Sequence, residues 1–591
     1  MPKSYDEVEE EYMHTGKTGK SFFRLVKDMA RMKRETSLMI LAVISTAIAG
    51  TLYPLALAEV INSITAKNLH FVFLFAAIFF GLYVAQFFAN RVRTITSTKL
   101  AQSTIKSLRD RSFNRLQYVP IEFFSRVKTG YLMSRITNDA ETLSEFLTFQ
   151  LPSVVSGITT VIVSIGIMMY LDFNLTMYSL VVIPILAGFS ISIQGRVRRN
   201  YLKTRRTIAA ITGNLAENIG AIRTIKAFNV EDRTADHFDG LNTNNFDANM
   251  KAARLSSLYG MIVRIIEALG IALVLYVGSL QLLGGFVSVG ILVAFVVYVE
   301  EFFDPVIQLS QLYNSYQSSM VGVSRIYGII DSEKESDYET SNQLDTFNGS
   351  IDFRDVTVTF GSTKALDNVN LSIKKGEKVA IVGHTGAGKT TLSNLILKFQ
   401  RTTSGSVTVD GKEITEISTK SYRELIAPVL QEPFMFRGTV YENIKFAKSD
   451  AGKDEINEIV EKFGLKAIFD SLPDGLESNV GEMGRNLSEG QRQAVSIIRA
   501  FIRDPEILIM DEATSQIDPG SEFLIIQALQ KFLSNKTLIL ITHRFSLISI
   551  VDRIVVMELG KMVQNGKFTD LVKRDGLFRD LYRIQRGLDF N

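Results

Sequence analysis

A glycine-rich stretch in the second half of the chain reads Gly383-His384-Thr385-Gly386-Ala387-Gly388-Lys389-Thr390-Thr391. It matches the phosphate-loop pattern G-x-x-x-x-G-K-[ST], with an apolar strand expected at 378–382 and a helix at 392–397. The glycines let several backbone N–H groups turn toward one anion, and the helix N-terminus adds its positive dipole end. The Lys389 ammonium can reach the β- and γ-phosphates of a nucleotide, and the Thr390 hydroxyl can bind Mg²⁺. Because the flanks are correct, we prefer this interpretation to a chance glycine-rich turn.

The composition indicates a chain with one apolar and one polar part. Of 591 residues, 46% are hydrophobic and 21% are charged, and this length allows more than one domain. The net charge of +3 is too small to indicate a nucleic-acid partner. There is no cysteine, so neither disulfides nor thiol chemistry contributes. Residues 1–20 are polar and show no removable signal peptide.

The first half of the chain is expected to cross a membrane six times. Each of six apolar segments is near the length of about 20 residues that a spanning helix needs. The segments are 37–61, 69–90, 149–171, 175–194, 259–283 and 287–310. Short loops alternate with two long polar stretches, 91–148 and 195–258, and these stretches hold most of the Lys and Arg. The positive-inside rule therefore predicts a multi-pass protein of the cell membrane with both termini in the cytoplasm.

The polar stretches keep a helical period, which predicts membrane helices that continue into the cytoplasm and are joined at their tips by short transverse helices. The candidates for these tips are 120–124 and 214–219. An amphipathic helix over 21–33 is expected to lie on the inner membrane face. Residues 330–349 form a polar linker, and from 350 onward strands alternate with helices as in an α/β nucleotide domain.

Two further apolar strands of this domain end in groups that nucleotide hydrolysis uses. The strand at 507–511 ends in Asp511, a carboxylate that can hold Mg²⁺, and Glu512 follows it. A carboxylate at position 512 can orient or deprotonate the water that attacks the γ-phosphate. The strand at 538–542 is followed by His543, which could hydrogen-bond that phosphate, although a lone histidine after a strand is more often structural.

Several motifs follow one another in a fixed order: GHTGAGKTT, VLQEPFMFRGTVYENI, VGEMG, LSEGQRQ, ILIMDEATSQID and ITHR. With this ordered set the chain resembles ATP-binding-cassette exporters, from about residue 20 to 585, as a half-transporter. The resemblance implies a membrane domain of six transmembrane helices, like that of type I exporters, followed by an α/β P-loop nucleotide-binding domain. The implied divisions are a tail at 1–20, a membrane domain at 21–329, a linker at 330–349 and a cassette domain at 350–591.

The resemblance also implies roles for single residues. Gln431 corresponds to the residue that touches Mg²⁺ and couples to the membrane domain, Asp511 to the metal-binding acid, Glu512 to the catalytic base and His543 to the switch histidine. Asp518 corresponds to the acid of the loop that follows, Phe360 to the ring that stacks on adenine, and Glu482 to the loop that senses the transverse helices. Ser488, Gly490 and Gln491 would contact the γ-phosphate of ATP held by an opposing subunit, so the protein is expected to work as a dimer.

Three positions depart from the usual pattern of this family. Glu489 stands where the signature LSGGQ has glycine, Phe360 replaces the commoner tyrosine, and the sequence Ser-Gln-Ile-Asp replaces Ser-Ala-Leu-Asp. A carboxylate close to the γ-phosphate should weaken ATP binding. Two interpretations stay open: the chain is one half of a heterodimer with one weakened site, or Glu489 is a harmless variant in a homodimer.

Charged residues within the expected spans indicate a functional site or a structural ion pair. Glu300, Glu301 and Asp304 lie in the sixth segment, and Arg264 and Glu267 in the fifth. One interpretation is a structural pair such as Arg264–Asp304. The other is a cargo cavity at Glu300 and Glu301 that prefers cationic or amphipathic molecules.

The sequence as a whole predicts ATP-driven export of amphipathic small molecules or lipids by alternating access, with ATP and Mg²⁺ as cofactors. The expected partners are a second half-transporter subunit, membrane lipid and the cargo, without nucleic acid. An ATP-gated channel or regulatory subunit on the same scaffold is the alternative, and Glu512 and His543 argue against it. The six spans exclude a soluble cassette ATPase.

Overall fold

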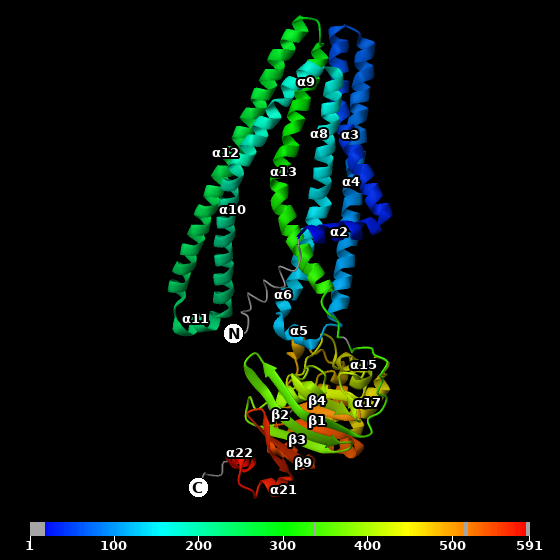
Figure 1. Ribbon diagram of the computed structural model, residues 1–591, viewed down its shortest axis with the longest axis vertical. Helices are drawn as coiled ribbons and strands as arrows, with labels where there is room; N and C mark the ends of the chain where they lie inside the picture. The colour runs from blue at the N-terminus through cyan, green and yellow to red at the C-terminus, as the bar shows by residue number, and fades with distance from the viewer. Residues whose placement is uncertain (1–17, 336, 513–517, 587–591) are drawn as a thin grey trace. The chain divides into compact units, whose positions relative to one another are not determined.

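The computed structural model describes residues 18–335, 337–512 and 518–586 and divides into two compact units (Figure 1). The membrane unit consists of residues 18–113 and 132–330. The nucleotide unit consists of 331–586 together with 114–131, a segment that lies between two helices of the membrane half in sequence.

The membrane unit is helical, and its described residues include five helices that are long and apolar enough to cross a membrane. Its helices are α2 (Thr18–Arg31), α3 (Lys33–Thr65), α4 (Leu69–Leu116), α6 (Thr129–Ser134), α7 (Ala140–Glu145), α8 (Leu151–Leu171), α9 (Phe173–Leu180), α10 (Val182–Gly220), α11 (Ile222–Phe228), α12 (Glu231–Leu283) and α13 (Val289–Ile330). The sixth predicted span, 287–310, falls almost wholly within α13. The other predicted spans also lie in helical structure, although 175–194 is divided between α9 and α10, and several helices continue well past the apolar segments, as expected.

One of the two predicted tips is confirmed and the other is wrong. The first is α5 (Ile121–Arg126), which begins after Pro120. Residues 214–219 do not form a separate helix, because they continue α10 to Gly220, helped by a 2.9 Å bond from the Asn218 amide to the Asn214 side chain. The short helix is α11, which joins α10 to α12 (Figure 1) and ends at Asn229 in a left-handed conformation.

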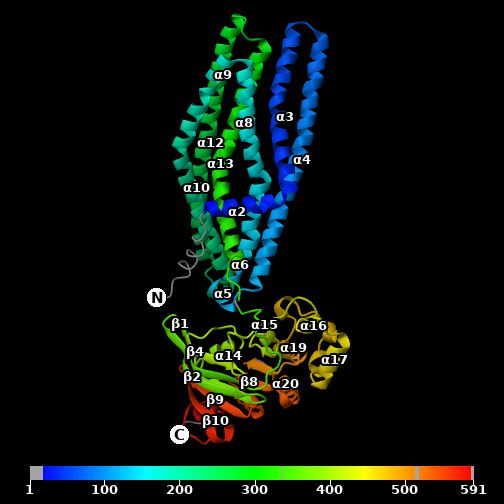
Figure 2. The same cartoon turned by 45° about the vertical axis from the view of Figure 1, so that its right-hand side comes forward.

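The N-terminal amphipathic helix is confirmed as α2. It crosses the long helices (Figure 2) and buries Leu25 and Met29 in a cluster with residues of α4 and α13. Asp28 anchors it, accepting bonds from Arg111 at 2.7 Å and from the Tyr327 hydroxyl at 2.9 Å. This polar anchor fixes the helix to the bundle in addition to its apolar contacts.

The segment after α13 packs on the nucleotide unit rather than forming a free tether. Glu335 pairs with Arg423 at 2.9 Å, and Asp337 pairs with Lys398 at 2.6 Å. The Glu335 N–H donates to the Tyr118 carbonyl at 2.8 Å, and the Tyr118 ring meets the Tyr338 ring edge-on. The linker therefore holds the residues that follow α4 against the nucleotide unit.

The nucleotide unit contains two sheets. Its strands are β1 (Ser350–Phe360), β2 (Thr363–Lys374), β3 (Lys378–Gly383), β4 (Ser404–Val409), β5 (Lys412–Glu413), β6 (Ile426–Val429), β7 (Ile507–Asp511), β8 (Thr537–Ile541), β9 (Arg553–Glu558) and β10 (Lys561–Gly566). Strands β2-β1-β4-β5 form an antiparallel sheet, and β10-β9-β3-β8-β7-β6 form a sheet that is parallel except for β10. Strands β3, β6, β7 and β8 are mostly buried runs of apolar residues, as expected for a parallel sheet covered on both faces.

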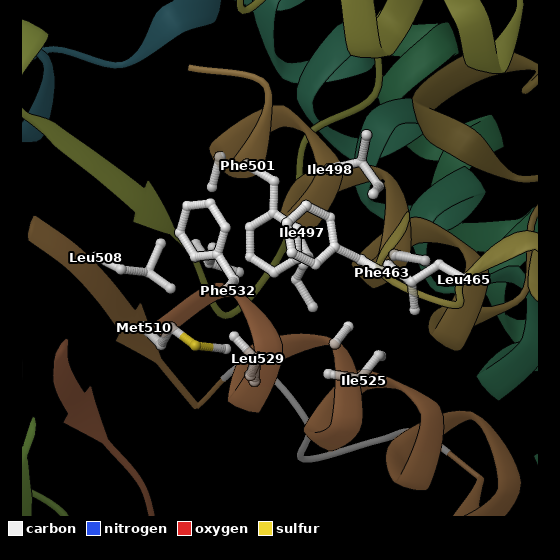
Figure 3. Packing of buried hydrophobic residues seen from close by; sticks show 14 of the residues in the cluster. Phe463, Leu465, Ile497, Ile498, Phe501, Leu508, Met510, Ile525, Leu529 and Phe532 are labelled. Atoms are coloured by element: carbon white, nitrogen blue, oxygen red, sulfur yellow. The ribbon is translucent and has the colours of Figure 1, made fainter. Parts of the chain in front are cut away.

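The helices of this unit are short except for two. They are α14 (Lys389–Ile396), α15 (Thr419–Glu424), α16 (Val440–Lys445), α17 (Lys453–Lys462), α18 (Lys466–Asp470), α19 (Glu489–Phe501), α20 (Pro519–Phe532), α21 (Phe568–Leu571) and α22 (Leu577–Arg586). A buried cluster joins α19 and α20 to β7 (Figure 3), and within it the rings of Phe501 and Phe532 stack at 4.0 Å. This packing fixes the N-terminus of α19 relative to the carboxyl end of β7.

Candidate functional site

Four neighbouring strands bring the predicted nucleotide residues to one edge of a sheet. Strands β3, β8, β7 and β6 are adjacent and parallel, so their carboxyl ends meet at the same edge. The glycine-rich loop follows β3, and His543 follows β8. Asp511 ends β7, with Glu512 after it, and Gln431 follows β6. The order of the strands in the sheet therefore brings these side chains to the same edge.

The loop after β3 needs its glycines for both conformation and space. Gly386 and Gly388 have φ of +81° and +99°, values that favour glycine. A Cβ on Gly388 would lie 2.5 Å from the Ala365 carbonyl oxygen. The loop residues His384, Thr385 and Ala387 lead into α14, whose first turn holds Lys389, Thr390 and Thr391.

Lys389 lies inside the curl of this loop. Its ammonium donates to the carbonyl oxygens of Gly383 at 2.9 Å and His384 at 3.0 Å, and the residue is only 6% exposed. Burial lowers the pKa of Lys389, while Glu512 and Asp511 oppose this change. The ammonium is thus positioned in the loop before any phosphate arrives.

Glu512 is held between Gln431 and His543. The Gln431 amide donates to one carboxylate oxygen at 2.9 Å, and His543 Nε2 lies 3.0 Å from the other. Glu512 has a φ of +46°, which is rare for a residue with a side chain, and its N–H donates to the Ile541 carbonyl at 2.8 Å. The three residues that the family resemblance names as catalytic thus meet at one carboxylate.

The donors expected for Mg²⁺ are oxygen atoms of the kind this ion prefers. They come from the carboxylate of Asp511, the hydroxyl of Thr390 and the amide of Gln431. Burial raises the pKa of Asp511, and the neighbouring Glu512 adds to the rise while Lys389 opposes it. Two adjacent carboxylates fit a site that receives a divalent cation.

The signature residues cap α19. The Ser488 hydroxyl accepts from the Gln491 N–H at 3.3 Å, and the Gln491 side chain accepts from the Ser488 N–H at 2.8 Å. The Gln491 amide also donates to the Ser471 hydroxyl at 3.0 Å, and Gly490 is buried. The capping box makes the N-terminus of α19 rigid, with its dipole aimed outward.

Glu489 forms an ion pair with Arg492 one turn later on α19. The Arg492 guanidinium also donates to the carbonyls of Gly484 at 3.1 Å and Leu487 at 2.9 Å. Arg492 is not among the site residues predicted from the sequence. Its spacing could have indicated the pair, because an acid and a base three residues apart on a helix are expected to meet. The charge that Glu489 brings to the signature is therefore compensated within the same helix.

The remaining predicted residues of the nucleotide unit lie on other elements. Phe360 ends β1 and is 52% exposed, as a ring available for stacking should be. Asp518 caps α20 by accepting from the N–H groups of Gly520 and Ser521, and these bonds lower its pKa. Glu482 pairs with Arg437 at 3.3 Å. Residues 513–517 of the loop before Asp518 lie outside the described part of the chain.

The charged residues of the membrane unit separate into different environments. Glu301 lines a cavity of about 620 Å³, whereas Glu300 is exposed and is not among the residues that line it. Arg264 bonds to both oxygens of Glu267, at 2.7 and 3.0 Å. The side chain of Asp304, the predicted partner of Arg264, lies outside the described ones. The structure thus gives Arg264 a partner on its own helix.

Comparisons with known proteins agree with this geometry. The family model described as ABC transporter transmembrane region matches residues 36–306, and the model described as ABC transporter matches residues 366–515. An uncharacterized ABC transporter ATP-binding protein of Bacillus subtilis, YknV, is 33% identical over 89% of this chain and 87% of its own length.

Two further relatives carry functional names. An ATP-dependent lipid A-core flippase of Desulfotalea psychrophila is 32% identical over 85% of this chain and 89% of its own length. A putative multidrug export protein of Staphylococcus aureus is 32% identical over 86% of both chains. The solved structure of a bacterial Atm1-family ABC exporter with ATP bound has a TM-score of 0.80, at 24% identity over 94% of this chain and 99% of that chain, and shows the shared fold. The chain therefore belongs to the ABC transporter family, as an exporter whose ATPase is coupled to transport.

Proposed function

We propose that two copies of this chain form an exporter that uses ATP to carry amphipathic small molecules or lipids across the cytoplasmic membrane. The observation that carries the proposal is the position of Glu512, fixed by Gln431 and His543 at the same sheet edge as the glycine-rich loop. The names of the lipid A-core flippase and the multidrug export protein support this class of cargo.

Hydrolysis in this site is a transfer of the γ-phosphoryl group of ATP to water. The Glu512 carboxylate orients the water and accepts its proton as the water oxygen bonds to the γ-phosphorus. The bond from that phosphorus to the bridging oxygen of ADP breaks at the same time. The Lys389 ammonium leaves its two loop carbonyls to bind the phosphates, and His543 can donate to the γ-phosphate. Mg²⁺, held by Asp511, Thr390 and Gln431, would neutralise phosphate charge.

The second copy completes each site. The capped N-terminus of α19 presents Ser488 and backbone N–H groups that suit an anion, so it can bind the γ-phosphate of ATP held by the other copy. ATP would then bind the closed arrangement of two nucleotide units better than the open one, and hydrolysis would remove this preference. The pairing of Glu489 with Arg492 favours two equal sites in a homodimer over a heterodimer with one weakened site.

The expected orientation follows from charge. The polar stretches 91–148 and 195–258 carry most of the basic residues of the membrane half, so both termini and the nucleotide unit would face the cytoplasm. Cargo would enter from that side or from the inner leaflet.

The proposal is tested with the full chain in proteoliposomes. Wild type should hydrolyse ATP and move a lipid or a cationic dye in proportion to it, whereas Glu512→Gln should bind ATP and lose about 10²-fold or more of its ATPase activity. Glu558→Gln, which changes an exposed carboxylate at the end of β9, is the matched control and should behave like wild type.

ATP-dependent ion currents without stoichiometric flux would favour the channel alternative. A purified chain that is monomeric and inactive until a different subunit is added would favour the heterodimer.

A further inference from the structure

The membrane unit contains a cavity of about 620 Å³ between α3, α4, α8 and α13. Ten of the fifteen lining residues have polar side chains: Thr46, Tyr53, Tyr83, Gln86, Asn90, Arg93, Ser153, Ser156, Thr160 and Glu301. Cavities for drug-like molecules are lined mostly by apolar groups, so this lining indicates a more polar ligand.

A carboxylate and two aromatic rings define one end of the cavity. Glu301 accepts from the Ser164 hydroxyl at 3.3 Å and is hydrogen-bonded to the Tyr53 hydroxyl. The rings of Tyr53 and Tyr83 lie 5.2 Å apart. Both hydroxyls can donate to this carboxylate, and aromatic faces attract cations. This end suits an ammonium group.

A guanidinium defines the other end. Residues Tyr83, Gln86, Asn90 and Arg93 follow one another at helical spacing along α4 and all line the cavity. Tyr83 and Arg93 are ten residues apart, about 15 Å along the helix axis. Because Tyr83 lies beside Tyr53, which bonds to Glu301, the acid and the base are at opposite ends. The Arg93 end suits a carboxylate.

The walls of the cavity also offer hydrogen-bonding groups. Gln86 and Asn90 of α4 supply amides, and Ser153, Ser156 and Thr160 of α8 supply hydroxyls. Proline adds acceptors, because Pro54 and Pro305 lack the N–H that would pair with the carbonyls four residues earlier. Those carbonyls belong to Gly50 and Glu301, and both residues line the cavity.

Glycines keep these walls close together. A Cβ on Gly50 would lie 2.9 Å from the Gln86 amide nitrogen, and one on Gly157 would lie 3.1 Å from the Pro305 ring. The close approach of α3 to α4 and of α8 to α13 therefore depends on residues without side chains. The packing of these helices therefore determines the shape of the cavity.

We propose that this cavity binds a short peptide with free termini, its ammonium at Glu301 and its carboxylate at Arg93. An extended chain advances about 3.3–3.6 Å per residue, so four or five residues span the two ends. The peptide amides pair with the side-chain amides and hydroxyls of the walls. The inference rests on the proposed export function and adds a polar cargo class to the amphipathic molecules and lipids proposed there, whereas a lipophilic cation would use only the Glu301 end.

The test measures binding of tetra-alanine to the purified full-length protein by calorimetry, beside the N-acetylated and the C-amidated peptide. Wild type should bind tetra-alanine and lose about tenfold or more in affinity when either end is blocked. Glu301→Gln should make affinity insensitive to N-acetylation, and Arg93→Gln should make it insensitive to C-amidation. Glu300→Gln, exposed on the same helix and outside the lining, is the matched control and should keep both preferences.

Three outcomes would overturn the inference: no binding of tetra-alanine, equal binding of free and blocked peptides, or preferences that persist in both variants. Tetraphenylphosphonium that binds through Glu301 where tetra-alanine does not would assign the cavity to lipophilic cations instead. ATPase activity and dye or lipid flux are measured on the same preparations. Loss of those activities in wild type would count against the export function, whereas their presence without peptide binding would count against the peptide site alone.

Discussion

Glu489 and Arg492 decide how much negative charge the signature presents to a nucleotide. Their ion pair lies in the first turn of α19, and Arg492 is also bound to the carbonyls of Gly484 and Leu487. Arg492 is thus fixed at two points besides the carboxylate. The pair makes this helix end electrically similar to one with glycine at position 489, which is why the departure from the family pattern is compatible with two working sites.

Removing Arg492 should expose the charge of Glu489. Arg492→Gln is expected to raise the KM for ATP by about tenfold, equivalent to ~1.4 kcal/mol, because the carboxylate then faces the γ-phosphate uncompensated. Steady-state ATPase measurements on Arg492→Gln and on Glu489→Gly with Arg492→Gln test this. The double variant should recover most of the lost affinity, and Arg485→Gln, an exposed arginine nearby, should change little. Equal KM values for the single and double variants would show that Arg492 acts only structurally.

His543 makes the nucleotide unit sensitive to acid. Burial and the nearby Lys389 lower the pKa of His543, and Glu512 opposes them. With a folded pKa below the unfolded value, the unfolded chain binds the proton more readily. The contribution of neutral His543 to the free energy of unfolding is therefore complete above the pKa of an unfolded histidine, near 6.5. It declines as the pH falls through that value toward the pKa of His543 in the folded protein.

Thermal unfolding of nucleotide-free protein between pH 7.5 and 5.5 tests this linkage. Wild type should lose more in Tm over this interval than His543→Asn, which cannot take up a proton. If the two proteins lost equal amounts, the acid sensitivity would have to come from other groups.

The linker packs more firmly than its sequence predicts. Its acidic, polar residues indicate a solvated tether, yet Asp337 is 8% exposed and pairs with Lys398 just after α14. The basic partners lie more than 60 residues away in the sequence, so no local pattern reveals them. The second helix tip was misplaced for a local reason, since nothing in 214–219 interrupts α10 before Gly220.

Breaking the linker pair on one side should be more harmful than removing it. Asp337→Asn leaves the Lys398 ammonium buried without its counter-charge, which is expected to cost about 3–5 kcal/mol. Asp337→Leu with Lys398→Met removes both charges and should recover much of the loss. Hydrogen exchange of the linker and β4 amides reports the effect. Equal exchange in the single variant and wild type would mean that the pair does not hold the linker.

At the scale of the whole chain, the sequence predicted the two-part architecture and the nucleotide edge because each depends on local patterns. Apolar segments of spanning length indicate the membrane helices, and the motifs end strands whose order the parallel sheet then fixes. The membrane cavity depends on packing and was predicted only in part. Glu301 was named, but Arg93 was counted with the polar stretch beyond the second span, whereas α4 continues unbroken and puts it in line with Tyr83.

ATP is expected to bring the nucleotide units of two copies together. The chain has no cysteine, so Lys531→Cys at the exposed end of α20 accepts a single spin label per copy. Electron–electron distances would be measured in the Glu512→Gln background, with Mg²⁺-ATP, with ADP and without nucleotide. With ATP, we expect a shorter label-to-label distance and a narrower distance distribution than with ADP or without nucleotide. The same distance distribution in all three conditions would contradict this expectation.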